Sequence, residues 1–259
     1  MAREPDTRTA LITGAGSGIG AATARRFAAD GFAVVCADID PASAEHVATQ
    51  IAATGSRALA IEADIADEAA VADMVGRALD WSGRLDAVAA NAGTMIEGGI
   101  LSLSLDDWTR ALTVNATGAF LTARAVLPHL IETKGALVFT CSTVALAGMR
   151  GVAAYSASKG AVAALTRQLA ADFAEHDVRV NAVAPGAVRT PLSESQFRAR
   201  AENDEAVEAL LSQVISRYPL SRWGQPEEIA EAILFLATDR SHWITGQILP
   251  IEGGLLQIR

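Results

Sequence analysis

The stretch Thr9-Ala-Leu-Ile-Thr-Gly-Ala-Gly-Ser-Gly-Ile-Gly20 decides the fold of the chain. Its first five residues form a short apolar run of the kind that predicts a buried strand. The glycines follow at once, and a helical pattern of apolar residues continues from them to the pair Asp30-Gly31. Strand, glycine-rich turn and helix in this order predict a dinucleotide site, because glycines admit the pyrophosphate and free N–H groups at the helix start meet its charge.

The rest of the chain repeats this alternation of strand and helix. Strands are predicted at residues 9–13, 32–37, 57–62, 85–89, 135–141, 179–183 and 243–251. Helical patterns separate them at residues 41–54, 67–82, 105–133, 151–176 and 226–237. Alternating strands and helices predict an α/β fold with a parallel sheet. We therefore expect one Rossmann-type, doubly wound sheet of about seven parallel strands, with helices on both faces, in a single domain spanning residues 1–259.

Composition excludes several classes of protein. The chain has 259 residues and a formal net charge of −9, which argues against nucleic acid or an anionic membrane as a partner. Residues 1–9 are polar, so no signal peptide is expected, and the longest apolar run is too short to cross a bilayer. Cys36 and Cys141 show no metal or redox spacing and are expected to be buried thiols. The four histidines show no metal-ligand spacing, so we predict a soluble cytoplasmic protein with no metal site.

Asp38 ends the second predicted strand, 18 positions after Gly20 (38 − 20). This is close to the spacing expected for the carboxylate that binds the adenosine ribose hydroxyls of a dinucleotide. The same carboxylate would repel a 2′-phosphate, and no arginine or lysine directly follows it to receive one. The alternative, a helix N-cap, is filled better by Asp40, which precedes Pro41. The sequence therefore predicts NAD (NADH) rather than NADP as the cofactor.

Tyr155 and Lys159 lie four residues apart in the predicted helix 151–176. Residues i and i+4 share one face of a helix about 5–6 Å apart, and a nearby positive charge favours the phenolate form of tyrosine. Such a pair can exchange a proton with a substrate oxygen. The chain has lysine at only two places, Lys134 and Lys159, and uses arginine elsewhere. By itself the Tyr-x-x-x-Lys pattern is common on surface helices, and only the other motifs give it weight.

Further polar residues stand at strand ends or interrupt helices. Asp64 and Ile65 follow the third strand, where Asp64 is a candidate adenine contact or a loop carboxylate. Asn91-Ala92-Gly93 follows the fourth strand, and Ser142 follows the fifth, at the sheet edge where open α/β sheets bind ligands. Asn115 interrupts the long helix 105–133; it is either a functional amide or a satisfied core asparagine.

Together these motifs resemble the short-chain dehydrogenase/reductase family, in its single-domain, NAD-preferring branch, over nearly the whole chain. The glycine turn fits the family pattern TGxxxGxG, and residues 91–93 fit its NAG turn although Ala90 replaces the usual first asparagine. Asn115, Ser142, Tyr155 and Lys159 fit the catalytic tetrad in order and spacing. A further departure is Glu252, where the family usually has aspartate before its closing glycines.

The resemblance implies a role for each motif. It implies that Tyr155 is the general acid/base, that Lys159 lowers the pKa of Tyr155 and binds the nicotinamide ribose, and that Ser142 orients the substrate oxygen. Asn115 would hold a water that links Lys159 to solvent. The implied cofactor-binding residues are Gly14, Ser17, Gly18, Ile19, Gly20, Asp38, Asp64, Ile65, Asn91, Ala92, Gly93, Tyr155, Lys159, Pro185, Gly186, Val188 and Thr190. Homotetramers built through the two long central helices are also usual in the family.

The substrate lies in the variable part of the chain. The pocket is expected to include Ser142, Val144, Met149, Tyr155 and Leu192, together with residues 94–96, Thr143, Arg150 and the segment 191–219. That segment is helix-like and highly charged, and we interpret it as a lid with a solvated outer face. One of its arginines, among them Arg198 and Arg200, could meet a substrate carboxylate, although solvated lid charges are the favoured interpretation.

Three functions remain in competition. The favoured one is an NAD-dependent oxidoreductase that interconverts a secondary alcohol and a ketone by direct hydride transfer. A 3-oxoacyl thioester reductase using NADPH is the alternative among enzymes, and Asp38 speaks against it. A non-catalytic NAD-binding regulator on the same fold is the third, and the intact tetrad speaks against that. The substrate and the direction of the reaction are not predicted.

Overall fold

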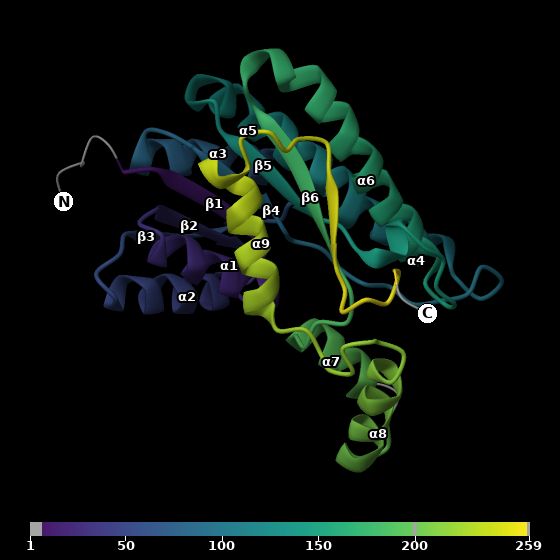
Figure 1. The fold of residues 1–259 in the computed structure, drawn as a ribbon. Helices are drawn as coiled ribbons and strands as arrows, with labels where there is room; N and C mark the ends of the chain where they lie inside the picture. The colour runs from purple at the N-terminus through teal and green to yellow at the C-terminus, as the bar shows by residue number, and fades with distance from the viewer. Residues whose placement is uncertain (1–6, 199–200, 258–259) are drawn as a thin grey trace.

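The fold is described by a computed structural model that covers residues 7–198 and 201–257. Residues 1–6, on which part of the signal-peptide expectation rests, and Arg200 of the charged segment lie outside the described residues. The sheet has seven parallel strands in the order β3-β2-β1-β4-β5-β6-β7, which confirms the predicted fold class (Figure 1). The strands are β1 (Thr9–Thr13), β2 (Ala33–Asp38), β3 (Ala58–Glu62), β4 (Ala87–Ala90), β5 (Ala136–Thr140), β6 (Arg179–Pro185) and β7 (Ile248–Ile251).

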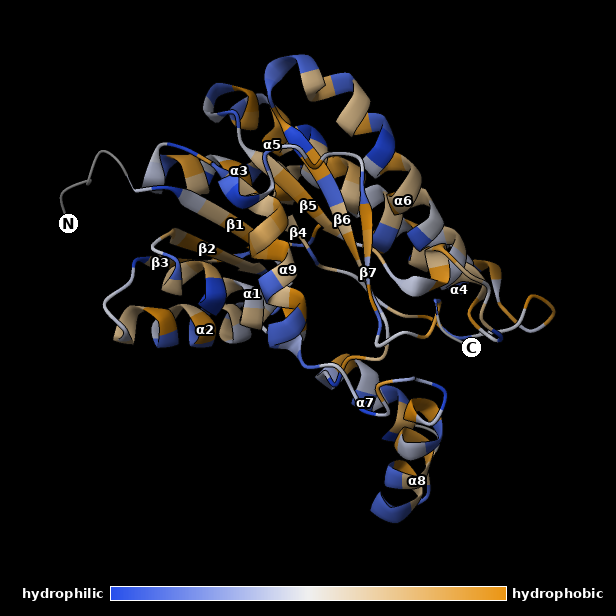
Figure 2. Ribbon diagram, viewed as in Figure 1, coloured by the Kyte–Doolittle hydropathy of each residue, from blue (hydrophilic) through white to orange (hydrophobic). Residues whose placement is uncertain are grey.

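Helices cover both faces of this sheet. One face carries α1 (Gly18–Ala29), α2 (Pro41–Ala53) and α9 (Pro226–Ala237), and the other carries α3 (Glu68–Ser82), α5 (Gly118–Thr133) and α6 (Ala153–Phe173), with α4 (Leu105–Leu112) beside α6. Alternate strand residues serve the two layers, as the period of a strand requires. In β1, Ala10 and Ile12 join the core under α1 and α9, whereas Leu11 joins the core under α3 and α5. Figure 2 shows the strands as predominantly apolar.

Two helices begin at the predicted aspartates. The Asp40 side chain accepts a hydrogen bond from the Ala42 N–H, directly before Pro41 in α2. The Asp67 side chain accepts from the N–H groups of Ala69 and Ala70 and starts α3. Because each cap satisfies a backbone donor that the helix cannot, the helix start is fixed locally by sequence. Asp40 is thus the cap of α2, which leaves the neighbouring Asp38 carboxylate for another role.

The predicted helix 105–133 is continuous but not uniformly α-helical. Between α4 and α5 the residues Thr113–Thr117 form one π-helical turn centred on Asn115, whose side chain is buried. A π turn inserts an extra residue into the helical register and is frequent at functional sites. It aims Asn115 inward, where an unbroken α-helix would have rotated it.

The last strand is shorter than predicted. β7 covers Ile248–Ile251, whereas the sequence predicted 243–251. Trp243 is fully exposed, and Gly246 has a φ of 70°, so residues 243–247 form a turn before the strand begins. The turn provides a hydrogen-bond acceptor for the buried Asn181 of β6, whose side-chain amide donates to the Ile244 carbonyl at 2.9 Å. Periodicity alone could not separate an apolar turn from an apolar edge strand.

The charged segment 191–219 forms two helices beyond the carboxyl end of the sheet. α7 (Pro191–Arg198) and α8 (Asp204–Ile215) extend from the body of the molecule in Figure 1. Val207 and Leu211 are the buried residues of α8, and the described charged residues on it are exposed. The helical, solvated character predicted for this segment is therefore found.

Candidate active site

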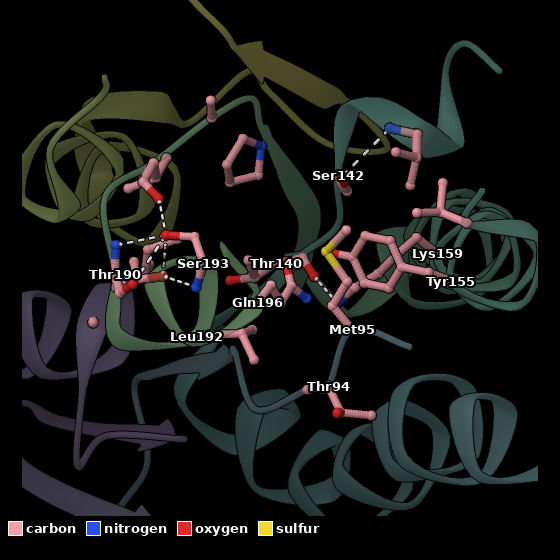
Figure 3. Close-up of a pocket in the computed structure, with 18 of the residues that line it drawn as sticks. Thr94, Met95, Thr140, Ser142, Tyr155, Lys159, Thr190, Leu192, Ser193 and Gln196 are labelled. Carbon is pink, nitrogen blue, oxygen red and sulfur yellow. Dashed lines mark hydrogen bonds between the residues drawn. The ribbon is translucent and has the colours of Figure 1, made fainter. Parts of the chain in front are cut away.

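A cavity of about 1240 Å³ lies along the carboxyl ends of the strands. It is the place where open parallel sheets bind their ligands. Figure 3 shows part of its wall, where Ser142, Tyr155 and Lys159 lie on one side and Thr190 and Ser193 on the other. Most of the site residues predicted from sequence line it: Gly14, Ser17, Gly18, Ile19, Asp38, Asp64, Ile65, Asn91, Ala92, Gly93, Ser142, Val144, Met149, Tyr155, Lys159, Pro185, Gly186, Val188, Thr190 and Leu192.

The glycine turn between β1 and α1 fits a dinucleotide. A Cβ on Gly14 would lie 2.9 Å from the Ala92 Cα, and Gly18 has a φ of 51°, so neither position tolerates a side chain without strain. Ser17 precedes α1, and its side chain makes no capping hydrogen bond to the described residues. The amides at the start of α1 are therefore left for an anion, and the turn provides the cradle that a pyrophosphate requires.

Gly20 does not line the cavity, in contrast to the sequence prediction. It is buried in the first turn of α1, where a Cβ would clash with the Gly14 carbonyl oxygen and approach the Asn91 side chain to 2.7 Å. Its role is to let α1 pack against the turn, so it supports the cofactor site without facing it.

Asp38 joins the end of β2 to the glycine turn. Its Oδ2 accepts a hydrogen bond from the Gly16 N–H at 2.8 Å, and its Oδ1 accepts from the Asp40 N–H at 3.0 Å. A Cβ on Gly16 would lie 2.9 Å from the same carboxylate. Asp38 therefore lines the cavity with a fixed orientation, at the position where the sequence predicted a ribose-binding carboxylate.

Asn91 ties β1, β4 and β5 together at the floor of the cavity. Its side-chain Nδ2 donates to the Thr13 carbonyl at 3.2 Å, and its Oδ1 accepts from the Thr140 hydroxyl at 3.0 Å. The Thr13 hydroxyl accepts from the backbone N–H groups of Asn91 and Ala92. These bonds hold three neighbouring strands in register where the ligand surface begins.

Tyr155 and Lys159 lie on the first turns of α6, against the end of β5. Lys159 is buried, its Nζ donates to the Thr140 carbonyl at 2.8 Å, and it lies 5.8 Å from the centre of the Tyr155 ring. Burial lowers the pKa of the Lys159 ammonium to about 8. Burial raises the pKa of Tyr155 to about 12, and a hydrogen bond with Ser142 offsets part of this shift.

The pKa of Tyr155 therefore differs from the expectation that the lysine lowers it. Loss of hydration is the largest effect on Tyr155 and outweighs the hydrogen bond with Ser142, and burial also disfavours the cationic form of Lys159. The pair lies at a cavity wall, with the Lys159 Nζ 5.8 Å from the centre of the Tyr155 ring, and both pKa values are perturbed, as at an acid/base site.

Asn115 is buried and does not line the large cavity. Its Oδ1 accepts from the Thr94 N–H and its Nδ2 donates to the Thr94 carbonyl, both at 2.8 Å. Its Nδ2 also donates to the Ser158 hydroxyl at 3.0 Å, and that hydroxyl donates to the Tyr155 carbonyl. A small cavity of about 10 Å³ touches both Asn115 and Lys159, close to the volume that one water requires.

The sequence missed several residues of the site. The Thr140 carbonyl accepts a hydrogen bond from the Lys159 ammonium, and the Ser158 hydroxyl links Asn115 to the Tyr155 carbonyl. Neither residue belongs to a sequence motif. Trp223 also lines the cavity, from outside the segment predicted as the lid. Ile96 was expected in the pocket but packs in a separate buried cluster with Ala111 and Ala154.

Two further structural features bear on the class of site. Within residues 7–198 and 201–257, no group of three or more His, Cys, Asp or Glu side chains could hold a metal ion. In the same part of the chain, no helix combines the length and apolarity that crossing a membrane would need.

The chain belongs to the short-chain dehydrogenase/reductase family. A family model described as "Enoyl-(Acyl carrier protein) reductase" matches residues 14–256. The chain is 37% identical over 249 residues to a meso-2,3-butanediol dehydrogenase of Serratia marcescens, which covers 96% of this chain and 94% of the relative. It is 39% identical over 247 residues to subunit BbsD of a (2S)-[(R)-hydroxy(phenyl)methyl]succinyl-CoA dehydrogenase of Thauera aromatica, with 95% and 96% covered.

A solved structure agrees with these relatives. The crystal structure of levodione reductase superposes with a TM-score of 0.89 at 33% identity, covering 95% of this chain and 96% of that one. These similarities define an oxidoreductase that acts on alcohol and ketone groups with a nicotinamide cofactor.

Proposed function

We propose that the protein is an NAD-dependent dehydrogenase that interconverts a secondary alcohol and a ketone by direct hydride transfer. The observation that carries the proposal is the half-buried Tyr155 with the buried Lys159, beside Ser142, at the wall of a cavity that also contains the glycine turn. One cavity thus offers a dinucleotide cradle and an acid/base group. The reaction balances as alcohol and NAD⁺ giving ketone, NADH and a proton.

Each residue of the wall has a distinct task. Tyr155 takes the hydroxyl proton during oxidation and returns it during reduction, and Ser142 hydrogen-bonds the same substrate oxygen. Lys159 sets the charge beside the phenol, and the Thr140 carbonyl fixes its ammonium. Bound NAD⁺ supplies the hydride acceptor and a positive nicotinamide ring. Asn115 and Ser158 position the loop at Thr94 and the first turn of α6, and the small cavity beside Lys159 suits a proton-relaying water.

The choice of NAD over NADP rests on Asp38. Its carboxylate is held by the Gly16 and Asp40 amides at the end of β2, where it would meet the ribose hydroxyls. A 2′-phosphate there would face a fixed negative charge. Arg150, Lys159 and Arg217 are the basic residues among those that line the cavity, and none belongs to β2 or to the loop after it. This also argues against the NADPH-dependent thioester reductase.

The substrate end of the pocket is largely apolar. Val144, Met149 and Leu192 line it, and Met149 and Leu192 are about half exposed, as expected for side chains that a substrate would cover. Segment 191–219 contributes the outer wall through α7 and α8. We propose that it acts as a lid, because the charged residues of α8 are exposed while Leu192 and Phe197 line the pocket.

The test is absorbance of NADH formation with NAD and then NADP over a panel of secondary alcohols, diols, cyclic alcohols and hydroxysteroids. We expect turnover with NAD on one class of alcohol and none in the Tyr155→Phe enzyme, which serves as the blank. Equal turnover in that variant would contradict the assignment of the acid/base. Binding of NADH without turnover on any alcohol or ketone would favour the regulator.

A further inference from the structure

The arginines of the chain differ in whether their side chains have partners. Among the described arginines, all but two make an ion pair, a hydrogen bond or a stacking contact with an aromatic ring. The two without such a partner in the described chain are Arg150 and Arg217, and both line the cavity. Neither guanidinium group makes such an interaction with another described side chain, so both are available to bind a ligand in the pocket.

Both arginines belong to the substrate end. Arg150 lies in the loop after β5, five residues before Tyr155, and Arg217 follows α8. The neighbour of Arg217, Tyr218, accepts a hydrogen bond from the Ala187 N–H beyond β6 at 2.9 Å. In the sheet, β1 and β4 separate β5 and β6 from β2, the strand that ends at Asp38. Since neighbouring strands lie about 4.8 Å apart, the arginines are remote from the ribose end of the cofactor site.

Two unsatisfied hydrogen-bond donors belong to residues that line the same cavity. Among the described residues, three buried side-chain nitrogen or oxygen atoms have no partner, and two of them, Gln196 Nε2 and Trp223 Nε1, belong to residues that line this cavity. The Trp223 ring is held edge-on by Phe197, with 5.9 Å between ring centres. An indole N–H can only donate, so it requires an acceptor from outside the chain. Figure 3 shows Gln196 in the middle of the pocket view, between Ser193 and Met95.

The charge of the rest of the molecule makes this end unusual. The chain carries a formal net charge of −9, yet the lining of this cavity includes two cations and two donors that have no partner among the described residues. Glu97 also lines the pocket, but it already has an interaction of its own. An apolar wall with unmet donors and positive charge at one side is complementary to an apolar molecule with an anionic, oxygen-rich end.

We propose that the substrate carries a carboxylate separate from its reacting carbon, and that Arg150 and Arg217 bind this carboxylate while Gln196 and Trp223 donate to its oxygens. The substrate class is therefore a hydroxy acid, oxidised to the corresponding oxo acid. This inference rests on the proposed dehydrogenase function and specifies its substrate.

The experiment compares oxo acids with their uncharged methyl esters in the NADH-dependent direction. The probes are 4-oxopentanoate, 5-oxohexanoate and 4-oxo-4-phenylbutanoate, each beside its methyl ester. We expect the kcat/KM of at least one acid to exceed that of its ester by about tenfold or more, the size of a charge-assisted hydrogen bond. Raising the salt concentration should reduce this ratio, since both arginines are exposed.

Three variants assign the preference to residues. Arg150→Gln and Arg217→Gln should each lower the acid-to-ester ratio of kcat/KM by about 3- to 10-fold, and Trp223→Phe should lower it while keeping the aromatic ring. The matched control is Arg77→Gln on α3, which makes the same change in net charge away from the cavity and should leave the ratio unchanged. Thermal melting of each variant checks that it is folded.

Binding gives a second measurement that needs no turnover. In the Tyr155→Phe enzyme saturated with NADH, the dissociation constant of 5-oxohexanoate should rise about 3- to 10-fold when Arg217→Gln is added, while that of NADH stays constant. Esters that match or exceed every acid would overturn the inference and leave the dehydrogenase intact. A loss of NADH affinity in the arginine variants would also overturn it, since the arginines would then serve the cofactor. If no acid, ester or neutral alcohol is turned over, the proposed dehydrogenase function itself is rejected.

Discussion

Lys159 shows how a single residue can oppose stability while serving chemistry. Its ammonium is buried, and its pKa falls from 10.5 to about 8. Below pH 8 both the folded and unfolded states hold the proton, and the folded state bears the full cost of the buried charge. Between pH 8 and 10.5 the unfolded state holds more protons, so the free energy of unfolding rises with pH over this window.

We therefore expect Lys159→Met to be inactive but more stable than the wild type at pH 7. The shift of 2.5 pKa units corresponds to about 3 kcal/mol, from which leaving the Thr140 carbonyl without its donor subtracts about 1–3 kcal/mol. A net gain of about 1 kcal/mol would raise Tm by about 2–4 °C, and it should shrink towards pH 10. The control is Lys134→Met, whose exposed ammonium pairs with Asp177 and should give no gain at any pH. Denaturation of both variants between pH 6.5 and 9.5 checks this, and a gain that grows with pH would contradict the buried charge.

Tyr155→Phe tests the proton transfer. The variant keeps the ring in the cavity wall but lacks the hydroxyl, so we expect kcat to fall by more than the ~10²–10⁴-fold typical of one acid/base group. The dissociation constant of NADH, measured by fluorescence, should change little. In the wild type, oxidation should quicken as pH rises, because the small phenolate fraction grows, whereas reduction should change little, because the raised pKa keeps the phenol protonated. A flat pH profile in both directions would contradict this role.

Asp38→Ala tests the cofactor choice. Removing the carboxylate leaves the Gly16 N–H without its acceptor. It also removes the group expected to bind the ribose hydroxyls. We expect the dissociation constant of NAD to rise about 10- to 100-fold and that of NADP to change less. Glu45→Ala, an exposed charge on α2, serves as the control. An unchanged ratio of the two constants would contradict the ribose role.

At the residue scale, the sequence identified cavity-lining residues where a motif fixes a backbone shape or a chemical partner. The glycine turn, Asp38, Asn91 and the Tyr155–Lys159 pair follow from such motifs and lie around one cavity. Residues that act through tertiary contacts have no local signal, as Ser158 and Trp223 show. The raised pKa of Tyr155 likewise depends on burial, which spacing along a helix does not reveal.

Among the described glycines, Gly20 leaves the least space for a side chain, at the contact between α1 and the turn that precedes it. Gly20→Ala would place a methyl group against the Gly14 carbonyl, so the helix must move away from the turn. We expect a loss of at least about 1–3 kcal/mol in the free energy of unfolding and weak NADH binding.

Gly76→Ala on α3 is the matched control. No atom lies within 4 Å of the added Cβ, and the position is exposed within a helix, so alanine should stabilise the chain by about 0.5–1 kcal/mol. Both variants are compared by chemical denaturation and NADH titration. A Gly20→Ala chain with wild-type stability and NADH affinity would contradict the packing argument.

The boundaries of elements show where sequence reasoning ends. Helix α9 was predicted correctly from Pro226 to Ala237, because Gln225 and Glu228 form a capping box and Pro226 occupies the first turn. The π turn at Thr113–Thr117 was not predicted, since apolar periodicity continues through it and the signal was a single polar residue, Asn115. The cause of the π turn is tertiary: the backbone of Thr94 binds that amide on both sides.

At the scale of the molecule, exposed apolar side chains on the central helices support assembly. Leu105 on α4 is 76% exposed and Phe120 on α5 is 45% exposed. We propose a homotetramer built through these helices, as the family usually forms. Light scattering should give four chains of 26.9 kDa at micromolar concentration, and Phe120→Asp should give a smaller species.

Ala52→Asp on the exposed side of α2 provides the control for this variant and should leave the mass unchanged. A wild-type protein that remains monomeric at this concentration would contradict the tetramer.

The strand order also has a consequence for how the chain reaches its fold during synthesis. β1 lies between β2 and β4, and its Thr9 amide is bonded by the Asp86 carboxylate, 77 residues later. While a ribosome elongates the chain, β1 can pair with β2 early, but its other edge stays open until β4 has emerged. At about 5–20 residues per second, this leaves an apolar strand edge uncovered for several seconds, when a chaperone can bind it. Nascent chains stalled before Asp86 should therefore be the ones most readily captured, and stalling beyond β4 should release them.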